Sequence, residues 1–289
     1  MSLRISLREL EVFAAVAERE TVTRAAERVA LTQSAASQAL DKLEQGLGVK
    51  LFDRVGRRLV INEHGRLLLP RARALLDAAS DMQDLFLGGE LALRIGASTT
   101  IANYLLPPLL AAFRQDWPQA RLELEVANTR DIVEAVAAFR VDFGLIEGPC
   151  HHAELLASPW RQDELVVFAA ADHALAGRKV AADELAEAGW ILREGGSGTR
   201  EEVERVLLPH LSRLAINMEL GHSEAIKHAV AAGLGVSCLS RHVVADLLAA
   251  GGIVELDADL PTLTRTLFRI QHRDKSISRG MEAFDGFLK

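Results

Sequence analysis

The stretch TVTRAAERVALTQSAASQALDKLEQGLGVKLFDRVGRR, residues 21–58, predicts two short amphipathic helices joined by a tight turn and followed by a basic hairpin. Thr21 is placed to cap the first helix and Thr32 to cap the second, which Gly48 ends. Leu51-Phe52 is expected to anchor the hairpin. The residues expected to face inward on the two helices are Ala25, Ala26, Val29, Leu31, Ala36, Ala39, Leu40, Leu43 and Leu47.

The outer face of the second helix carries short polar side chains, and the hairpin carries arginines. Such groups suit the base edges and phosphates of a DNA major groove. The candidate DNA-binding residues are Thr32, Gln33, Ser34, Ser37, Gln38, Lys42, Arg54, Arg57 and Arg58. The alternative is a helical pair with a solvated basic loop. The order of cap, small-residue crossing, polar outer face and arginine hairpin favours a winged helix-turn-helix that binds double-stranded DNA.

The charge of the chain is unevenly distributed. Residues 1–73 hold thirteen Lys and Arg against nine Asp and Glu, a net charge of +4, whereas the remainder carries −11. This asymmetry is what a basic DNA-binding head on an acidic sensor body would produce. Because +4 is modest, phosphate contacts must come from well-placed residues and from more than one copy of the head.

The length and the N-terminus favour a multidomain protein of the cytoplasm. A chain of 289 residues is long enough for about two domains. No apolar run approaches the ~18 residues of a membrane span. The N-terminus, MSLRISLREL, lacks the uninterrupted apolar stretch of a signal peptide, so we expect the protein in the cytoplasm.

The N-terminal part resembles the DNA-binding half of the LysR-type transcriptional regulators. The matching stretches are LRELEVFAAVAE (7–18), AAERVALTQSAASQALDKLEQGLGVKLFDR (25–54) and NEHGRLLLPRARALL (62–76). Family members usually carry Thr where Asn62 stands as the cap of the following helix. Asn caps at least as well, so this departure changes little.

Residues from Asn62 to about Leu87 predict one long helix with an apolar stripe. The stripe either packs on its own domain or forms a self-association surface. The resemblance implies the second, a homodimer or homotetramer, because this linker helix forms the dimer contact in LysR-type proteins. The expected dimerisation residues are Leu68, Leu75, Leu76 and Met82. Gly88-Gly89 is expected to end the helix and begin a hinge.

Beyond the hinge, strands alternate with helices. The expected strands are 91–98, 121–128, 141–148, 164–171, 190–193, 216–220, 235–240 and 264–272, with helices between them and one around 276–288. This order predicts two doubly wound α/β units with mainly parallel sheets. If the last strand returns to the first unit, crossovers near 159–163 and 261–266 make a ligand-gated clamshell.

The resemblance implies the same two-lobed α/β arrangement, similar to periplasmic binding proteins. The chain is thus an α+β multidomain protein with three expected parts. These are a winged helix-turn-helix domain (1–61), a linker helix with hinge (62–89) and an effector-binding domain (90–289), of which lobe 1 is 90–161 and 267–289 and lobe 2 is 162–266.

Hydroxyl side chains follow several of the predicted strands, where helix N-termini present free N–H groups to ligands. Alone, each Ser or Thr is more often a helix cap. Several at equivalent strand ends favour a polar pocket for a small anion. The candidate effector-binding residues are Ser98, Thr99, Thr100, Thr129, Glu147, Gly196, Ser197, Gly198, Thr199 and His222. The GSGT run is loosely like a phosphate loop, but no GK[ST] follows, so it does not predict a nucleotide site.

The segments WILREGGSGTREEVE and MELGHSEAIKHAVAAGLGVSCLSRHVV resemble LysR-type regulators of sulfur assimilation and carbon fixation. The resemblance places Ser98, Thr100, Thr129 and Thr199 at effector-contact positions. It favours a sulfur oxyanion such as sulfite or sulfate as effector, or else a short carboxylate. His222 either adds charge to the cleft or packs on the surface. Arg200 either clamps an oxyanion or pairs with one of residues 201–204, with the pairing preferred.

Other kinds of site are poorly supported. Cys150-His151-His152 lacks the distant partner pair of a zinc site, so we expect no metal, and the two cysteines are expected to be buried free thiols. For Glu147, capping or solvation is preferred to a role in the cleft. No nucleophile–base motif is present, so we expect neither an enzyme nor a cofactor. The alternatives to a ligand-responsive regulator are an architectural DNA-binding protein and an enzyme acting on the bound molecule; RNA polymerase is a further candidate partner.

Overall fold

The computed structural model describes residues 4–56, 58–87 and 91–288, and within the last part of the linker helix the side chains of 81 and 84–87 lie outside this description. The chain forms two compact units. The first comprises residues 1–90 with 137–139 and 274–279, and the second comprises the rest of the chain. Each unit has its own hydrophobic core. Within the described residues, no helix is both long enough and apolar enough to cross a membrane.

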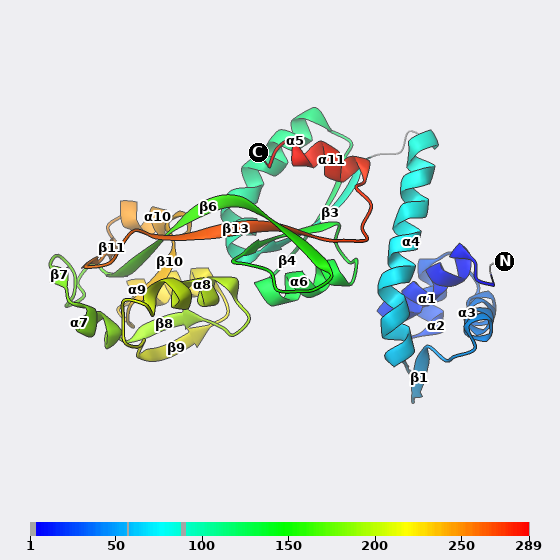
Figure 1. Cartoon of the computed structure of the whole chain (residues 1–289), viewed down its shortest axis with the longest axis horizontal. Helices are drawn as coiled ribbons and strands as arrows, with labels where there is room; N and C mark the ends of the chain where they lie inside the picture. The colour runs from blue at the N-terminus through cyan, green and yellow to red at the C-terminus, as the bar shows by residue number, and fades with distance from the viewer. Residues whose placement is uncertain (1–3, 57, 88–90, 289) are drawn as a thin grey trace. The chain divides into compact units, whose positions relative to one another are not determined.

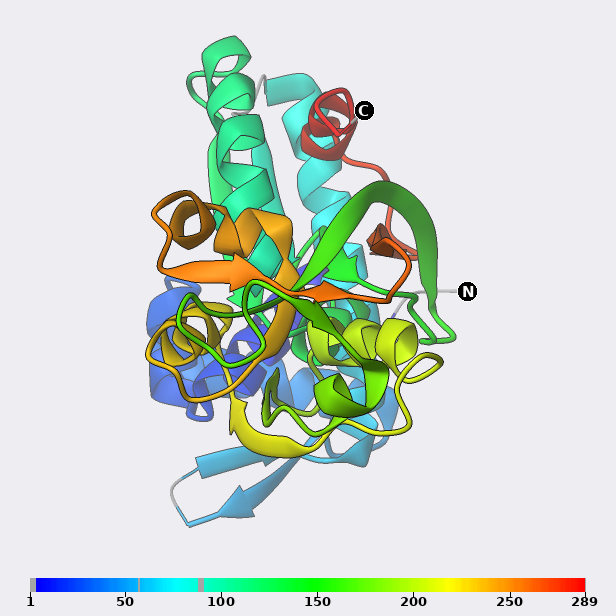
Figure 2. The same cartoon turned by 90° about the vertical axis from the view of Figure 1, so that its left-hand side faces the viewer.

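The first unit is a small helical domain with a two-stranded hairpin and one long helix. Its elements are α1 (Leu7–Arg19), α2 (Val22–Arg28), α3 (Gln33–Leu47), β1 (Phe52–Val55), β2 (Arg58–Ile61) and α4 (Glu63–Leu87). The strands β1 and β2 pair antiparallel from Phe52 opposite Ile61 to Val55 opposite Arg58. Figure 2 shows this hairpin in light blue at the lower edge of the view. The unit is therefore a winged helix-turn-helix with an attached helix.

The predicted caps of the first unit are present. The Thr21 hydroxyl accepts a hydrogen bond from the Arg24 backbone N–H, and the Thr32 hydroxyl accepts one from Ala35. Gly48 ends α3 in the left-handed conformation at φ 73°, which a residue without Cβ adopts at no steric cost. Each cap satisfies backbone groups that a helix end leaves free, which accounts for the close agreement of the helix starts with the prediction.

The core of the first unit is made of small and apolar residues from all four helices. Ala25, Ala26 and Ala36 are buried where α2 and α3 cross, and Leu51 and Phe52 anchor the hairpin on the same core. Leu47 was expected to face inward, and this expectation is wrong: its side chain is 38% exposed. Glu44 is buried one turn earlier instead. Its carboxylate accepts hydrogen bonds from the Leu51 backbone N–H and from Lys50. The last turn of α3 thus fastens the hairpin through a carboxylate.

The long helix α4 has one face on the core of its own unit and another in solvent. The Asn62 side chain accepts a hydrogen bond from the Gly65 N–H, as expected of a cap. Leu68 and Leu76 are partly buried against the core of the first unit. Leu75 and Met82 are exposed on the helix. The residues predicted for the hinge, 88–89, lie outside the described part.

Within the second unit, lobe 1 is a sheet covered by helices on both faces (Figure 1). Its elements are β3 (Ala92–Ser98), the π-helix η1 (Ile101–Leu105), α5 (Leu106–Asp116), β4 (Arg121–Ala127), α6 (Thr129–Ala137), β5 (Phe143–Glu147) and α11 (Arg279–Asp285). Strand β3 pairs parallel with both β4 and β5, so the carboxyl ends of all three strands lie at one edge. The helix expected after Thr100 is present, but it begins with a π turn, a rare form found often at functional sites.

Lobe 2 is a second layered α/β arrangement. Its elements are β7 (Lys179–Val180), α7 (Ala182–Ala186), β8 (Trp190–Arg193), α8 (Gly198–Leu207), β9 (Ile216–Leu220), α9 (Ser223–Ala231), β10 (Ser237–Ser240), α10 (Arg241–Ala249), β11 (Ile253–Glu255) and β12 (Asp257–Ala258). Side chains on opposite faces of its strands enter different cores. Val203 of α8 lies with Val167 in one core, and Ile226 of α9 lies with Val166 in the other. Helices therefore cover both faces here too.

Two long strands run through both lobes. They are β6 (Leu155–Ala170) and β13 (Leu263–His272), which pair antiparallel along their length and run side by side in Figure 1. They contain most of the segments expected to be crossovers, and β13 also pairs with β5 of lobe 1, as expected of a returning strand. The prediction of mainly parallel sheets is wrong here, because β6 leaves lobe 1 and β13 comes back, while β10 and β11 also pair antiparallel with β6.

Candidate functional site

The polar face of α3 is open to solvent. Gln33, Ser34, Gln38 and Lys42 are exposed, and Ser37 is half-buried. The helix that carries them is held from behind by buried leucines and alanines. An exposed row of hydrogen-bonding side chains on a rigidly packed helix is the arrangement by which helix-turn-helix proteins read a major groove.

The hairpin extends the basic surface of the first unit. Arg54 is exposed on β1, and Arg58 at the start of β2 forms an exposed ion pair with Glu20, with 3.2 Å between Nη1 and Oε2. Arg57 lies outside the described residues. Thr32, also exposed, caps α3 and lies 3.1 Å from the Ser34 hydroxyl. Three of the candidate residues thus have a structural contact in addition to any contact with DNA.

In the second unit, the predicted strand-end residues gather where the two lobes meet, a region we call the lobe junction. Its residues are Ser98, Thr99, Thr100, Asn128, Thr129, Glu147, Asp163, Arg193, Glu194, Ser197, Gly198, Thr199, Ser223 and Arg265. The parallel pairing of β3, β4 and β5 explains why residues far apart in sequence lie at one edge. Lobe 2 supplies the N-terminal ends of α8 and α9.

Arg265 is the central cation of the lobe junction. It is 1% exposed, and its Nε donates to Asp163 Oδ2 at 2.8 Å while Nη1 donates to the Thr199 hydroxyl at 3.0 Å. Its Nη2 lies 3.9 Å from Glu147 Oε1. The other Glu147 oxygen accepts from the Thr129 hydroxyl at 3.2 Å. One network therefore joins Thr129 and Glu147 of lobe 1, through the long strands, to Thr199 of lobe 2.

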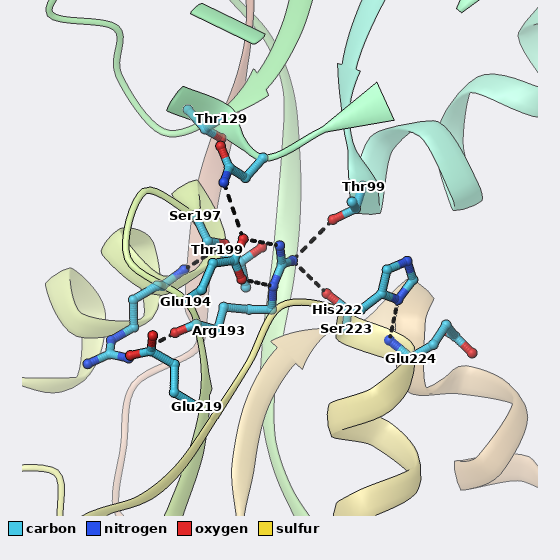
Figure 3. Close-up of polar contacts among 12 residues, drawn as sticks. Thr99, Thr129, Arg193, Glu194, Ser197, Thr199, Glu219, His222, Ser223 and Glu224 are labelled. Atoms are coloured by element: carbon cyan, nitrogen blue, oxygen red, sulfur yellow. Dashed lines mark hydrogen bonds and ion pairs between the residues drawn. The ribbon is translucent and has the colours of Figure 1, made fainter. Parts of the chain in front are cut away.

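Arg193 forms a second connection between the lobes. Figure 3 shows its guanidinium between Thr99 and Ser223, to whose hydroxyls Nη1 donates at 3.1 and 3.0 Å. Its Nε and Nη2 donate to Glu194, which also accepts from the Asn128 amide. Burial alone would raise the pKa of the Glu194 carboxyl. The hydrogen bonds and charge of Arg193, together with hydrogen bonds from the Glu194 backbone and the Asn128 amide, outweigh burial, so that pKa lies below its ordinary value. Glu194 is thereby kept ionised as the partner of Arg193.

The GSGT loop lets the lobes approach closely at Gly198. A Cβ at this position would lie 2.4 Å from the Glu147 carbonyl oxygen and 2.4 Å from the Thr129 hydroxyl. Only a residue without a side chain permits this approach, as expected for the loop glycines. Ser197 caps α8 by accepting from the Arg200 N–H, so its oxygen already has a structural partner. At Gly196 the backbone has φ 90° and Arg130 lies over the position of a Cβ.

The sequence left the roles of His222 and Arg200 open, and the structure gives each of them a contact within the protein. The His222 imidazole caps α9: its Nδ1 accepts from the Glu224 backbone N–H at 3.2 Å, while the residue remains exposed (Figure 3). Arg200 pairs with Glu204 and donates to the Arg193 carbonyl, so the preferred structural pairing is present. Both residues therefore have structural contacts that do not require a ligand.

A further contact between the lobes involves the π-helix. The hydroxyl of Tyr104 on η1 donates to the Glu224 carboxylate on α9. Glu224 also pairs with Lys227, which is buried and bound by Asp246. Burial would lower the pKa of the Lys227 amine, but these two carboxylates raise it above its ordinary value, so the amine stays charged. The Tyr104–Glu224 contact is thus a third connection between lobe 1 and lobe 2.

Six residues of the lobe junction were missed from the sequence: Asn128, Asp163, Arg193, Glu194, Ser223 and Arg265. The signal for Arg265 was present, because in a strand alternate side chains share a face, and Arg265 lies between Leu263 and Leu267 on the inward face of β13. Asp163 lies directly opposite Arg265 on β6. That register depends on tertiary pairing, so the identity of the buried ion pair could not be read from either segment alone.

The cysteines and histidines form no site of their own in the described residues. Cys238 is buried, and burial raises the pKa of its thiol to about 12, which keeps it protonated and unreactive. Cys150 is half-buried, so the expectation of burial holds fully only for Cys238. No group of three or more His, Cys, Asp or Glu side chains in the described part could hold a metal ion.

Two family models together match nearly the whole chain. The family model described as "Bacterial regulatory helix-turn-helix protein, lysR family" matches residues 7–66. The model described as "LysR substrate binding domain" matches residues 88–289. The chain is 55% identical to YeiE of Escherichia coli (strain K12), described as an uncharacterized HTH-type transcriptional regulator, over 98% of this chain and 96% of the relative.

Solved structures are similar over the same extent. A full-length OxyR variant from Pseudomonas aeruginosa has a TM-score of 0.81 at 26% identity and covers 98% of this chain and 94% of its own. The regulatory domain of CcmR from Synechocystis PCC6803, solved in complex with 2-PG, has a TM-score of 0.63 at 31% identity and covers 68% of this chain and 95% of its own. A helix-turn-helix, a linker helix and a two-lobed α/β domain in this order, matched end to end, make the chain a member of the LysR family of DNA-binding transcriptional regulators, and not of an enzyme family.

Proposed function

We propose that this LysR-type regulator is controlled by a small anionic effector that binds at the lobe junction. The observation that carries the proposal is a set of buried polar groups without hydrogen-bond partners among the described residues. The residues Ser98, at the end of β3, and Thr100, just before η1, are 1% exposed, and their hydroxyls have no hydrogen-bond partner. Arg265 Nη2 also has no hydrogen-bond partner, although it lies 3.9 Å from Glu147 Oε1. A buried donor without a hydrogen-bond partner lowers the stability of the fold by about 1–3 kcal/mol, and a bound ligand that accepts the hydrogen bond removes this cost.

The chemistry of these groups favours an anion. Two hydroxyls and a guanidinium N–H all donate hydrogen bonds, and charge-assisted bonds of this kind bind oxyanions well. A sulfur oxyanion such as sulfite or sulfate, or a short carboxylate, supplies acceptors for these donors. The similarity to CcmR, whose regulatory domain was solved with 2-PG, supports a ligand-binding role for this domain.

Binding at the lobe junction would act through lobe closure. The Arg193 and Arg265 networks and the Tyr104–Glu224 contact all join the lobes. A ligand that shares these groups stabilises one arrangement over another and can thereby change the spacing or angle of the DNA-binding heads. We place this action in the cytoplasm, on palindromic promoter sites bound by a dimer or tetramer, with RNA polymerase as a candidate partner.

The first expected result tests the effector site. Thr100→Val removes the unpaired hydroxyl at nearly constant volume, so it should weaken the affinity for the effector by about 1–3 kcal/mol while leaving folding intact. A thermal-shift screen of small oxyanions and short carboxylates identifies the effector, and calorimetry on the full-length protein measures the loss. Thr264→Val, at an exposed position of β13, is the matched control. If no compound of the screen binds saturably, the protein is better described as an architectural DNA-binding protein.

The second expected result tests the DNA-binding face. Gln38, exposed on α3, is proposed to bind a base edge. Gln38→Ala should weaken binding to the cognate site by about 1–3 kcal/mol and relax its sequence specificity, since a base contact carries sequence information. Binding curves on cognate and scrambled duplexes measure both effects. Equal losses on the two duplexes would assign Gln38 to the phosphate backbone instead.

A further inference from the structure

The lobe junction contains an acceptor without a partner as well as donors. Glu147 is 3% exposed, and its Oε1 has no hydrogen-bond partner among the described residues. Arg265 Nη2, also without one, lies 3.9 Å away. This distance is too long for a direct hydrogen bond, for which about 2.7–3.2 Å is required. One oxygen atom lying about 2.7–3.2 Å from each group would bridge this separation.

Neither side chain is free to close this gap without breaking other bonds. Arg265 is held by Asp163 at 2.8 Å and by Thr199 at 3.0 Å, and Glu147 is held by Thr129 at 3.2 Å. The gap is therefore a consequence of these other hydrogen bonds. An atom that fills it must accept a hydrogen bond from Nη2 and donate one to Oε1, because a guanidinium only donates and a carboxylate only accepts.

A hydroxyl oxygen meets both requirements, and a bare oxyanion oxygen meets only the first. The charges around Arg265 also favour a hydroxyl oxygen over a bare oxyanion oxygen at this position. Around Arg265 stand two carboxylates, Glu147 and Asp163, so the buried group as a whole is net negative. An anion without hydrogen would meet the lone pairs of Glu147 Oε1 in a buried region, where like charges are expensive.

From this geometry, and resting on the proposed function, we infer that the effector is an anion that carries an O–H group. Its hydroxyl bridges Arg265 Nη2 and Glu147 Oε1, and its charged oxygens accept from Ser98 and Thr100. Glu147 is then the residue that determines specificity. Bisulfite, hydrogen phosphate and 2-hydroxycarboxylates have this chemistry. Sulfate and simple carboxylates do not.

The test compares anions that differ in the hydroxyl. Calorimetry on the full-length protein near neutral pH uses hydrogen phosphate against sulfate, and glycolate against propionate, in which a methyl group replaces the hydroxyl. Sulfite, which is partly protonated under these conditions, distinguishes a sulfur oxyanion from a hydroxycarboxylate as the source of the O–H group. In at least one pair, we expect the hydroxyl-bearing member to bind tenfold or more tightly than its partner.

The variant Glu147→Gln tests the assigned residue. An amide can still accept from Thr129 and can turn an N–H toward the ligand, so the preference for hydroxyl-bearing anions should disappear and the affinity for sulfate or propionate should rise. Glu201→Gln, an exposed carboxylate on α8, removes the same charge and should keep the wild-type preference. The melting temperature of each variant verifies that it is folded.

The results separate this inference from the proposed function. If sulfate and propionate bind the wild-type protein as tightly as their partners, the inference is wrong and the proposed function stands, with a water molecule bridging Arg265 and Glu147. If Glu147→Gln keeps the wild-type preference, Glu147 does not determine specificity and the inference is also wrong. If none of the anions binds while DNA binding is normal, the proposed anionic effector is wrong and the inference fails with it.

Discussion

Replacing Arg265 with methionine is expected to lower the free energy of unfolding of the second unit by about 3–5 kcal/mol, because it leaves buried carboxylates without their cation. Asp163 and Glu147 both face Arg265 and are 3% exposed. Methionine fills much of the volume, so the loss reflects charge more than packing. Urea or thermal unfolding monitored by circular dichroism measures the effect.

Two further variants give this experiment its controls. Arg178→Met, in lobe 2, breaks an exposed bidentate pair with Glu184 and should leave stability nearly unchanged, since solvent screens such pairs. Arg265→Lys keeps the charge, but the ammonium group cannot reach Asp163, Thr199 and Glu147 at once. Its free energy of unfolding should therefore lie between those of Arg265→Met and Arg178→Met. An Arg265→Met protein as stable as Arg178→Met would show that the buried cation is dispensable.

Leu75→Asp is expected to convert the assembled protein to a monomer and to weaken binding to a two-half-site operator by about 10²-fold or more, because the second head no longer binds from a tethered position. Leu75 is 52% exposed on α4, and Leu67 and Met82 are exposed with it. At 100° per residue the three lie within about 80° of one another around the helix. This is an apolar stripe with one polar residue, Arg71, among its members.

The matched control for assembly is Ser80→Asp. Ser80 is also exposed on α4 but lies about 140° around the helix from Leu75, outside the stripe. It introduces the same charge and should leave the oligomeric state unchanged. Sedimentation at micromolar concentration gives the mass, and titration with single-half-site DNA should show unaltered affinity for both variants. A Leu75→Asp protein that sediments like the wild type would refute α4 as the assembly surface.

The DNA-binding unit could be predicted in most of its detail because its signals are local. Thr21, Thr32 and Asn62 cap the next residues along the chain, and Gly48 ends its own helix. Leu47 was wrongly predicted to face inward, because the apolar stripe of α3 was extended by one turn. At this end of the helix the buried carboxylate of Glu44 contacts the hairpin instead. A contact between residues seven positions apart outweighed the periodicity there.

The lobe junction could be predicted in part. Hydroxyls at strand ends identified Thr99, Thr129 and Thr199, all of which take part in the networks that join the lobes. The sequence also favoured the ends of strands as the place for a ligand, since parallel strands bring those ends together. It offered no means to tell which of the hydroxyls are bonded to protein groups and which, like that of Thr100, remain without a partner.

The sequence by itself determined the winged helix-turn-helix, the long linker helix and the alternation of strands and helices, because caps, glycines and hydrophobic periodicity act over a few neighbouring residues. Only the tertiary structure decided the antiparallel course of β6 and β13 and the burial of Arg265 between Asp163 and Glu147. A charged side chain is stable inside a protein only beside its counter-charges. Those counter-charges come here from strands more than a hundred residues away along the chain, whose register arises only when the two lobes fold together.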